Sequence, residues 1–174
     1  APKYSSVLPS EVNTSVKLSK NLNLKIPLLS SAMDTVTESK MAIEMAKAGG
    51  IGVIHRNLSI SDQILEIKKV QKKGLVVGAA VGTNDTELTL AEKIFMCNLD
   101  FFVVDTAHGH TKRVANIIKF IKKKKSNKTT LCAGNIATAE AAKFLCKLGV
   151  DIVKVGIGPG SVSYTHLRAH ETLV

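Results

Sequence analysis

Residues 101–121 read FFVVDTAHGHTKRVANIIKFI: a continuous apolar run, a polar segment, and then apolar residues at helical spacing. The run at 101–104 is typical of a strand that is buried on both faces, as in a parallel sheet. The recurrence of Val114, Ile117 and Ile121 predicts a helix with one apolar side. This stretch therefore predicts strand, loop and helix in succession, which is the repeating unit of α/β folds.

The same unit recurs along the chain. Further apolar runs predict strands at residues 26–30, 51–54, 75–81, 130–133 and 152–155. Helical spacing of apolar residues follows at 60–67 and 141–148. Ser59 and Asp62 have the spacing of a capping box, and Gly149 stands where a helix-ending glycine belongs. Strand and helix alternate, which fits either an open doubly wound sheet or a (β/α)8 barrel.

The length of the chain limits the number of domains and strands that it can form. The chain has 174 residues, 45% of them hydrophobic, which is enough for one globular domain and too little for two. A complete barrel takes about 250 residues, so a barrel would be truncated after about the sixth strand. Neither a secretory signal nor an apolar run of eighteen residues occurs, so we expect a cytoplasmic protein without a membrane partner.

The cysteines and the charge point to no special partner. Cys97, Cys132 and Cys146 are odd in number and lack CxxC spacing, so we expect core thiols rather than disulfides or a zinc site. The net charge of +10 raises the question of nucleic acid. However, the densest basic run, at 122–125, ends a predicted helix, where cations suit the helix dipole, and few aromatic residues are available for base stacking. We expect no nucleic-acid partner. The electrostatic field of the positive net charge would attract an anionic small substrate instead.

Polar residues and glycines follow most of the predicted strands. They lie at residues 30–35, 55–57, 105–110, 134–135 and 156–161. Functional groups of α/β folds gather at the carboxyl ends of the strands, so we expect a site along one rim. The alternating glycines at 156, 158 and 160 could let backbone groups approach a phosphate or cation, or they could form only a tight turn.

Several single residues leave alternatives open. Asp105 could hold a ribose through its carboxylate, or it could cap the following helix. His108 and His110 could bind a metal, although an HxH pair is more often part of a polar loop. Met33 could stack on a base or fill the mouth of a barrel.

Six segments taken together resemble the IMP dehydrogenase family. They are SSAMDTVTE at 30–38, GGIGVIHRN at 49–57, GAAVG at 78–82, VVDTAHGH at 103–110, AGN at 133–135 and KVGIGPGS at 154–161. The resemblance covers residues 1–161 and implies a partial catalytic barrel, namely a (β/α)8 TIM barrel truncated after about the sixth strand. It also implies an oxidoreductase of GMP biosynthesis that oxidises IMP to XMP with NAD, through a cysteine that attacks purine C2 and forms a covalent intermediate.

The resemblance assigns roles to single residues. It implies that Ser31, Met33 and Ser161 contact IMP. The residues implied to lie at the NAD cofactor are Asp105, Thr106, Ala107, Asn135, Gly156, Ile157, Gly158 and His55. Backbone carbonyls of Gly158 and Gly160 would bind a potassium ion that orders the cysteine loop. Intact members are commonly homotetramers.

Two features of the sequence distinguish it from related proteins of the same superfamily. GMP reductase shares the glycine-rich loop and is the alternative, but DTAHGH and SSAMDTVTE favour the dehydrogenase. Many IMP dehydrogenases carry a pair of regulatory CBS modules after the second helix. Here residues 70–74 run directly into the third predicted strand, so we expect no such insert.

The resemblance breaks after residue 161. Ser163 occupies the position of the catalytic cysteine, and a serine hydroxyl without an adjacent base is a far weaker nucleophile. Residues 162–174 show neither the next helix nor the seventh strand, and we interpret them as a non-native tail. We therefore expect an inactive fragment of the enzyme, with a noncatalytic nucleotide-binding fragment as the alternative.

Overall fold

In the described part of the chain, six parallel strands form one sheet in the order in which they occur along the sequence. They are β3 (Leu29–Ser30), β4 (Ile51–Ile54), β5 (Gly78–Val81), β6 (Phe101–Asp105), β7 (Thr130–Ile136) and β8 (Ile152–Val155). The helices between them are α1 (Ser39–Lys47), α2 (Ile60–Gln71), α3 (Asp85–Phe95), α4 (Lys112–Lys124) and α5 (Ala139–Lys147). This computed structural model describes residues 4, 6–124 and 128–156.

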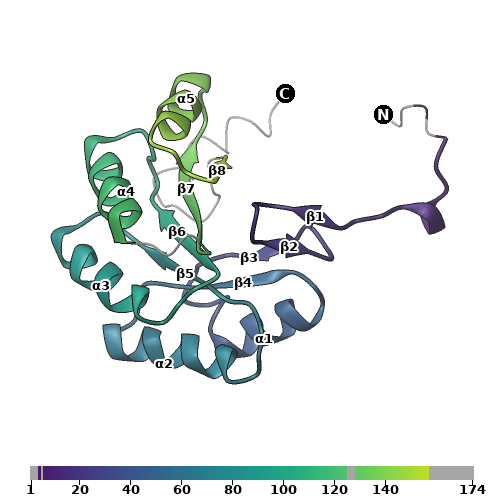
Figure 1. Cartoon of the computed structure of the whole chain (residues 1–174), viewed down its shortest axis with the longest axis horizontal. Coiled ribbons are helices and arrows are strands. Elements are labelled where there is room, and N and C mark those ends of the chain that lie inside the picture. The colour runs from purple at the N-terminus through teal and green to yellow at the C-terminus, as the bar shows by residue number, and fades with distance from the viewer. Residues whose placement is uncertain (1–3, 5, 125–127, 157–174) are drawn as a thin grey trace, which may run out of the picture.

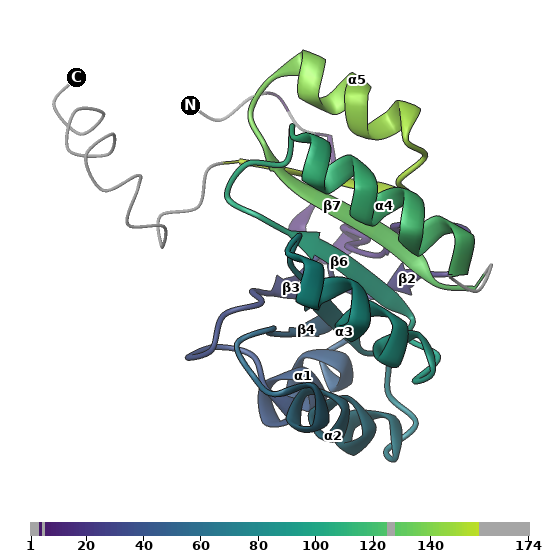
Figure 2. The same ribbon diagram turned by 90° about the vertical axis from the view of Figure 1, so that its left-hand side faces the viewer.

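The helices follow one another on an arc around one side of the curved sheet (Figure 1), and Figure 2 shows them stacked along its outer face. A doubly wound sheet would instead carry helices on both faces and reverse its strand order. The expected (β/α) barrel, truncated after about the sixth strand, is therefore confirmed as a half-barrel, and among the described residues β3 and β8 are the outer strands of its sheet.

Alternation along the strands divides the apolar residues into two layers. On β6, Phe102 and Val104 pack in a large cluster between the sheet and the helices. Phe101 and Val103 face the inside of the half-barrel, where they join a smaller cluster that includes Cys132 of β7. The inner face is thus filled at its centre and leaves the strand ends for polar groups.

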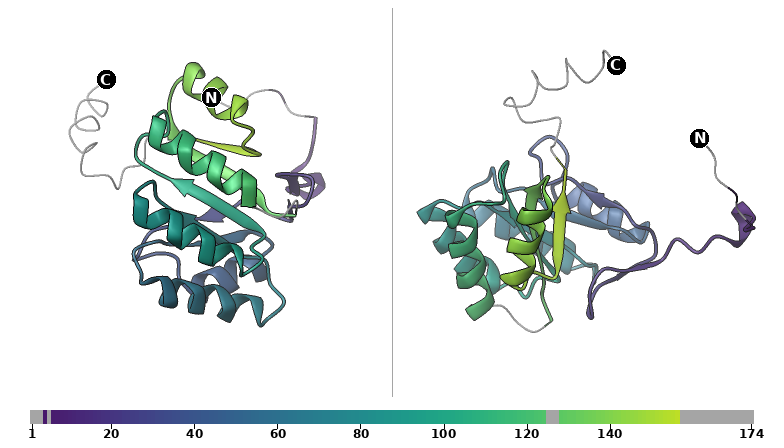
Figure 3. Two further views of the ribbon diagram at one scale, coloured as in Figure 1. Left: turned by 60° about the vertical axis from the view of Figure 1, so that its left-hand side comes forward. Right: turned by 90° about the horizontal axis from the view of Figure 1, so that it is seen from above.

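A short hairpin that the sequence analysis did not anticipate closes the amino ends of the strands. It consists of β1 (Val16–Lys17) and β2 (Asn23–Leu24), and Leu22 and Leu24 are buried in the inner cluster. Ser19 Oγ lies 2.6 Å from Thr130 Oγ1 at the start of β7. The 3-10 helix η1 (Pro9–Glu11) precedes the hairpin on a segment that extends away from the sheet, as Figure 3 shows.

The helix ends follow the predicted signals. Ser59 Oγ accepts a hydrogen bond from the Asp62 backbone N–H (3.1 Å) at the start of α2. Gly149 adopts a φ of +75° after α5, as a helix-ending glycine should. Glu66 of α2 caps a neighbour instead of its own helix, because its carboxylate accepts from the Ser39 N–H (2.7 Å) at the start of α1.

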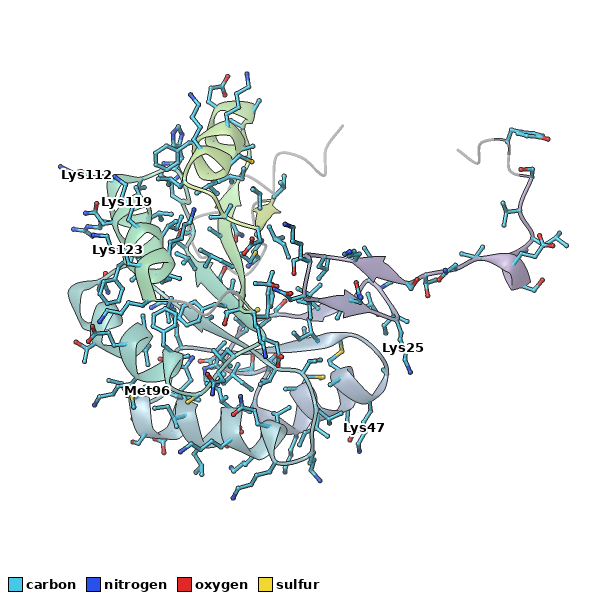
Figure 4. All side chains as sticks on the ribbon, viewed as in Figure 1. Lys25, Lys47, Met96, Lys112, Lys119 and Lys123 are labelled. Carbon is cyan, nitrogen blue, oxygen red and sulfur yellow. The ribbon has the colours of Figure 1, made fainter. Side chains whose placement is uncertain are left out.

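The basic run at the end of α4 makes local contacts. Lys122 Nζ donates to the Leu148 carbonyl (3.2 Å) at the end of α5, and Lys124 pairs with Glu92 of α3 (3.1 Å). Lys112, Lys119 and Lys123 point outward from the same helix (Figure 4).

Three expectations need correction in detail. The first strand is confined to Leu29–Ser30, because Pro27 supplies no N–H for a ladder. The third begins only at Gly78, since the N–H of the preceding residue, Val77, donates to the Asp100 carboxylate (3.2 Å). Cys146 is exposed, unlike Cys97 and Cys132, so it is not a core thiol. Within the described part of the chain, none of the helices could cross a bilayer.

Candidate active-site rim

Residues on three neighbouring strands meet at the carboxyl end of the sheet and form the β6–β8 group. Asp105, Gly134 and Lys154 are consecutive partners in the parallel register of β6, β7 and β8. Lys154 Nζ donates to Asp105 Oδ1 at 2.7 Å. Beyond this ion pair, the Thr106 N–H donates to the Gly134 carbonyl (2.9 Å) and the Asn135 N–H to the Thr106 carbonyl (2.7 Å).

Asn135 and Gly156 leave capacity for a ligand in this group. Asn135 lies at a register irregularity between Gly134 and Ile136, the kind of bulge that often re-aims a side chain beside an active site. Its Oδ1 atom is buried and has no hydrogen-bond partner among the described residues. Gly156 adopts a φ of +128°, and a Cβ there would meet no atom of the described residues within 4 Å. A ligand could therefore donate a hydrogen bond to Asn135 Oδ1 and approach the backbone closely at Gly156.

Cys132 lies beneath the ion pair as the preceding inward-facing residue of β7. Burial raises the pKa of its thiol to about 12, with Lys154 lowering the pKa and Asp105 raising it by lesser amounts. The thiol is consequently neutral at physiological pH and does not serve as a nucleophile.

A second set of polar residues, the β3–β4 group, lies at the ends of those two strands, with β5 between it and the β6–β8 group. Its centre is Thr37, which is fully buried and donates through Oγ1 to the Ser31 carbonyl (2.5 Å), with Ser30 Oγ 2.9 Å away. Met33 is exposed on the same loop, whose turn is closed by the Thr37 N–H donating to the Met33 carbonyl (3.0 Å). These bonds fix the loop and present Ser31 and Met33 at the rim.

His55 lies within the β3–β4 group and is only 2% exposed. Its Nδ1 accepts from the Asn57 N–H (3.1 Å), which places the proton of the neutral ring on Nε2. That Nε2 has no hydrogen-bond partner among the described residues, and the nearest carboxylate oxygen, Glu38 Oε1, is 3.6 Å away. A pocket of about 510 Å³ beside the start of α1 is lined in part by Glu38, Asp34 and Met41.

The geometry decides one of the alternatives that the sequence left open, the role of Asp105 as a helix cap. Thr111, not Asp105, caps α4, because its Oγ1 accepts from the Val114 N–H (3.2 Å). Asp105 faces the inside of the half-barrel instead. His110 packs its ring against Phe144 with 4.7 Å between centroids, and no cluster of three or more His, Cys, Asp or Glu residues occurs in the described ranges.

Comparison with known proteins shows the family to which the chain belongs. A family model described as the IMP dehydrogenase / GMP reductase domain matches residues 1–170. The chain is 40% identical to an inosine-5'-monophosphate dehydrogenase of Borreliella burgdorferi and 38% identical to one of Cryptosporidium parvum, with 97% of this chain aligned in each case. A Staphylococcus saprophyticus enzyme of the same name is 30% identical over the same share of the chain.

The chain belongs to the IMP dehydrogenase / GMP reductase domain family. It spans about half the length of the relatives, 54% of the Borreliella enzyme and 52% of the Cryptosporidium enzyme. The alignments extend over 218 and 211 residues, more than the 174 of this chain, so the relatives carry internal residues that it lacks. In this family member only residues 72–77 join α2 to β5.

The structure brings together some of the residues that the family resemblance singles out. Asp105, Thr106, Asn135 and Gly156 lie in the β6–β8 group with Ala107 next in the chain, whereas Ser31, Met33 and His55 lie in the β3–β4 group. Ile157, Gly158, Gly160, Ser161 and Ser163 lie outside the described residues.

Lys154 was missed as a site residue by the sequence analysis. Two signals were present: Lys154 opens the family segment KVGIGPGS, and it stands two residues after an inward apolar residue, Ile152. A lysine inside an apolar strand is unusual unless it has a partner, and that partner lies 49 residues away.

Proposed function

We propose that this chain forms the nucleotide-binding part of an IMP dehydrogenase barrel, an enzyme that oxidises IMP to XMP with NAD in GMP biosynthesis. The observation that carries the proposal is the convergence of Asp105, Asn135 and Gly156 at the ends of three adjacent strands. These are positions at which the sequence resembles the family, and relatives named inosine-5'-monophosphate dehydrogenase align with 97% of the chain.

The residues present fit a nicotinamide riboside. The Asp105 carboxylate is 25% exposed and can accept from ribose hydroxyls, and the orphaned Asn135 Oδ1 can accept from an amide N–H. Thr106 and Ala107 would line the same side. When bound, NAD would supply the hydride acceptor, and this chain's groups would bind and orient it.

On the substrate side, Ser31 and Met33 would contact IMP from a loop that Thr37 holds in place. Ser161 would contribute from the glycine-rich segment. Potassium bound by the carbonyls of Gly158 and Gly160 belongs to the proposal on the strength of the family resemblance alone.

Residues 1–161 would be the partial catalytic barrel and residues 162–174 a non-native tail. Because Ser163 stands at the position of the catalytic cysteine, we expect nucleotide binding without turnover. The same serine favours the second candidate, a noncatalytic nucleotide-binding fragment. We further propose a cytoplasmic location, a homotetramer for the intact enzyme, and neither nucleic acid nor a membrane as partner.

The test is calorimetric titration of the purified chain with NAD⁺ and with IMP, followed by an assay for NADH formation with both present. Saturable binding is expected, with no IMP-dependent NADH above background. Asp105→Ala should weaken NAD⁺ binding, whereas Glu92→Ala on the outer surface of α3 should not.

Failure of both nucleotides to bind would contradict the proposal. Turnover that Ser163→Ala abolishes would contradict the expected inactivity. NADPH-dependent deamination of GMP would instead favour GMP reductase.

A further inference from the structure

Two buried polar side chains of α2 link this helix to other parts of the fold. Gln63 and Glu66 are about one turn apart, and no more than 9% of either residue is exposed. Gln63 Nε2 donates to the carbonyls of His55 (3.0 Å) and Ala80 (2.9 Å), just beyond the last residues that β4 and β5 pair with each other. Gln63 thus fixes α2 to the carboxyl ends of these two strands.

Glu66 links α2 to the neighbouring helix α1. The two helices lie side by side in both Figure 1 and Figure 2. Glu66 Oε2 accepts from the Ser39 N–H (2.7 Å) at the first residue of α1, and Lys69 Nζ donates to Oε1. Both carboxylate oxygens are therefore engaged, and one of them holds the start of α1.

Helix α1 depends on this contact because its own N-cap residue does not cap it. That residue, Glu38, makes no side-chain capping hydrogen bond. The first N–H groups of a helix have no partner inside the helix, and a negative charge near them is favourable to the helix dipole. Burial alone would raise the pKa of Glu66, but hydrogen bonds from Lys69 and Ser39 hold it below its ordinary value of 4.5. The group that caps α1 is therefore charged at neutral pH.

The start of α1 is also the end of residues 31–38, which we call the substrate loop because it carries Ser31 and Met33. These eight residues separate β3 from α1, and β3 contributes two paired residues to the sheet. Hydrogen bonds from Thr37 to the Ser31 and Met33 carbonyls make the loop one unit. Its place on the rim then depends on how its ends are held, and Ser39 is the end that Glu66 holds.

Two further contacts hold the substrate loop, and both are weaker by exposure or by length. Asn57 Nδ2 donates to Asp34 Oδ2 (3.0 Å) at an exposed position, and the His55 N–H lies 3.4 Å from the Thr37 carbonyl. The Glu66 contact is short, buried and made to a charged acceptor, which is the stronger kind of hydrogen bond. Since α2 lies on the outer face of the sheet, Glu66 acts on the loop through α1 and not by touching a ligand.

We propose that Glu66 is a positioning residue, which fixes the start of α1 from α2 and thereby places Ser31 and Met33 for IMP. This inference rests on the proposed function, since it takes IMP as the ligand of the substrate loop. It adds a residue of the outer helix layer, whereas the site residues implied by the family resemblance belong to the rim.

The experiment is calorimetric titration of the full chain with IMP for the wild type and three variants. Glu66→Ala removes the cap, so a fraction of the molecules should hold the loop out of place and IMP affinity should fall roughly 5-fold, as expected for the loss of a helix cap. Glu66→Gln keeps the shape and one acceptor for the Ser39 N–H. Its loss should be about 2-fold, because a neutral acceptor gives a bond of about half the strength.

Ile67→Val is the matched control. Ile67 is the next residue of α2 and is fully buried in the cluster between the sheet and the helices. The change loosens the packing of the same helix without touching the cap, so IMP affinity should match the wild type. Urea unfolding shows whether each variant is folded under the conditions of the titration. Should Glu66→Ala fail to fold, the comparison of Glu66→Gln with Ile67→Val decides.

Hydrogen exchange followed by mass spectrometry adds a local readout. The N–H groups of Met33, Val36 and Thr37 donate to carbonyls within the substrate loop. In Glu66→Ala they should exchange faster than in the wild type, whereas the amides of β6 and β7 should not. Ile67→Val should leave the exchange of the loop unchanged.

The outcomes separate this inference from the proposed function. IMP affinity that is indifferent to both changes at Glu66, or that falls equally in Ile67→Val, would overturn the role of Glu66 and leave the proposed function standing. Faster exchange throughout the chain, and not in the loop alone, would indicate a general loss of stability and would also overturn that role. A wild-type chain that does not bind IMP would overturn the proposed IMP site and the role of Glu66 together.

Discussion

The β3–β4 group and the β6–β8 group occupy the same rim of the sheet but use their polar atoms differently. In the β3–β4 group the buried Thr37 and His55 bind backbone groups of their own loops. In the β6–β8 group the Asp105 carboxylate stays partly exposed and Asn135 Oδ1 has no partner among the described residues. The β3–β4 group thus uses most of these polar atoms to fix its own loops, with His55 Nε2 left unpaired among the described residues, while the β6–β8 group leaves a carboxylate and an amide oxygen for a ligand.

The largest expected effect is on the β6–β8 group, through Gly134→Ala. The new Cβ would collide with backbone atoms of Lys154, so β8 must shift away from β7. We expect a loss of about 1–3 kcal/mol or more in the free energy of unfolding, as for other overpacking changes. Urea unfolding measures it.

Gly74→Ala is the control for Gly134→Ala. Gly74 has a φ of +67° and open space around its Cβ position, so only backbone strain of about 1 kcal/mol is expected. Equal losses for the two variants would contradict the close β7–β8 approach at Gly134.

Thr37→Val tests the β3–β4 group. The change keeps the shape but removes the hydroxyl that donates to the Ser31 carbonyl, and the loss of such a hydrogen bond costs about 0.5–1.5 kcal/mol. Urea unfolding should show this loss, and Thr37→Ser should recover most of it. Equal losses for Thr37→Val and Thr37→Ser would contradict the role of the hydroxyl.

Glu66→Gln probes the support beneath the β3–β4 group. Burial alone would raise the pKa of Glu66, but hydrogen bonds from Lys69 and Ser39 outweigh it and hold the pKa below its ordinary value of 4.5. A lowered folded-state pKa stabilises the fold above the unfolded pKa, and this contribution is lost as the pH falls through the folded value.

We therefore expect Glu66→Gln to cost about 1 kcal/mol at neutral pH and progressively less below pH 4.5, where the wild-type carboxyl also becomes neutral. Urea unfolding as a function of pH measures the difference. Glu44→Gln, in an exposed pair with Lys47, should cost less than about 0.5 kcal/mol. A difference between wild type and Glu66→Gln that grows in acid would refute the assignment.

The smallest effect concerns Cys132. We expect its thiol to stay unreactive toward alkylating reagents as long as the chain is folded. With a pKa of about 12, its thiolate fraction at pH 8 is on the order of one in ten thousand. Iodoacetamide should therefore modify the exposed Cys146 first, and mass spectrometry of the peptides identifies the product. Rapid labelling of Cys132 in the folded chain would show that the inner face is open beneath the ion pair.

Local patterns predicted the strands and helices that depend on burial. Residues 101–104 form a strand because both faces of β6 are covered by apolar residues. A strand buried on both faces has a continuous apolar sequence, and this can be read from the chain alone. Ser59 and Gly149 act at helix ends as their spacing predicted, since capping involves residues only a few positions apart.

Long-range contacts could not be predicted in this way. The pairing of Lys154 with Asp105 depends on the register of three strands and on the absent side chain of Gly134. The hairpin consists of two-residue strands, too short for any periodicity, and is held by Leu22 and Leu24 against distant residues. The role of Asp105 was left open for the same reason, because the sequence did not show that Thr111 caps α4.

The hairpin also constrains the order in which the chain can fold. Ser19 and Thr130 are 111 positions apart, yet their hydroxyls meet at 2.6 Å. At ordinary rates of synthesis, the ribosome needs about 5–20 s to make the residues between them. During this time Leu22 and Leu24 lack the β6 and β7 partners of their cluster. The hairpin is therefore synthesised well before β6 and β7, and Leu22 and Leu24 cannot complete their cluster until those strands form.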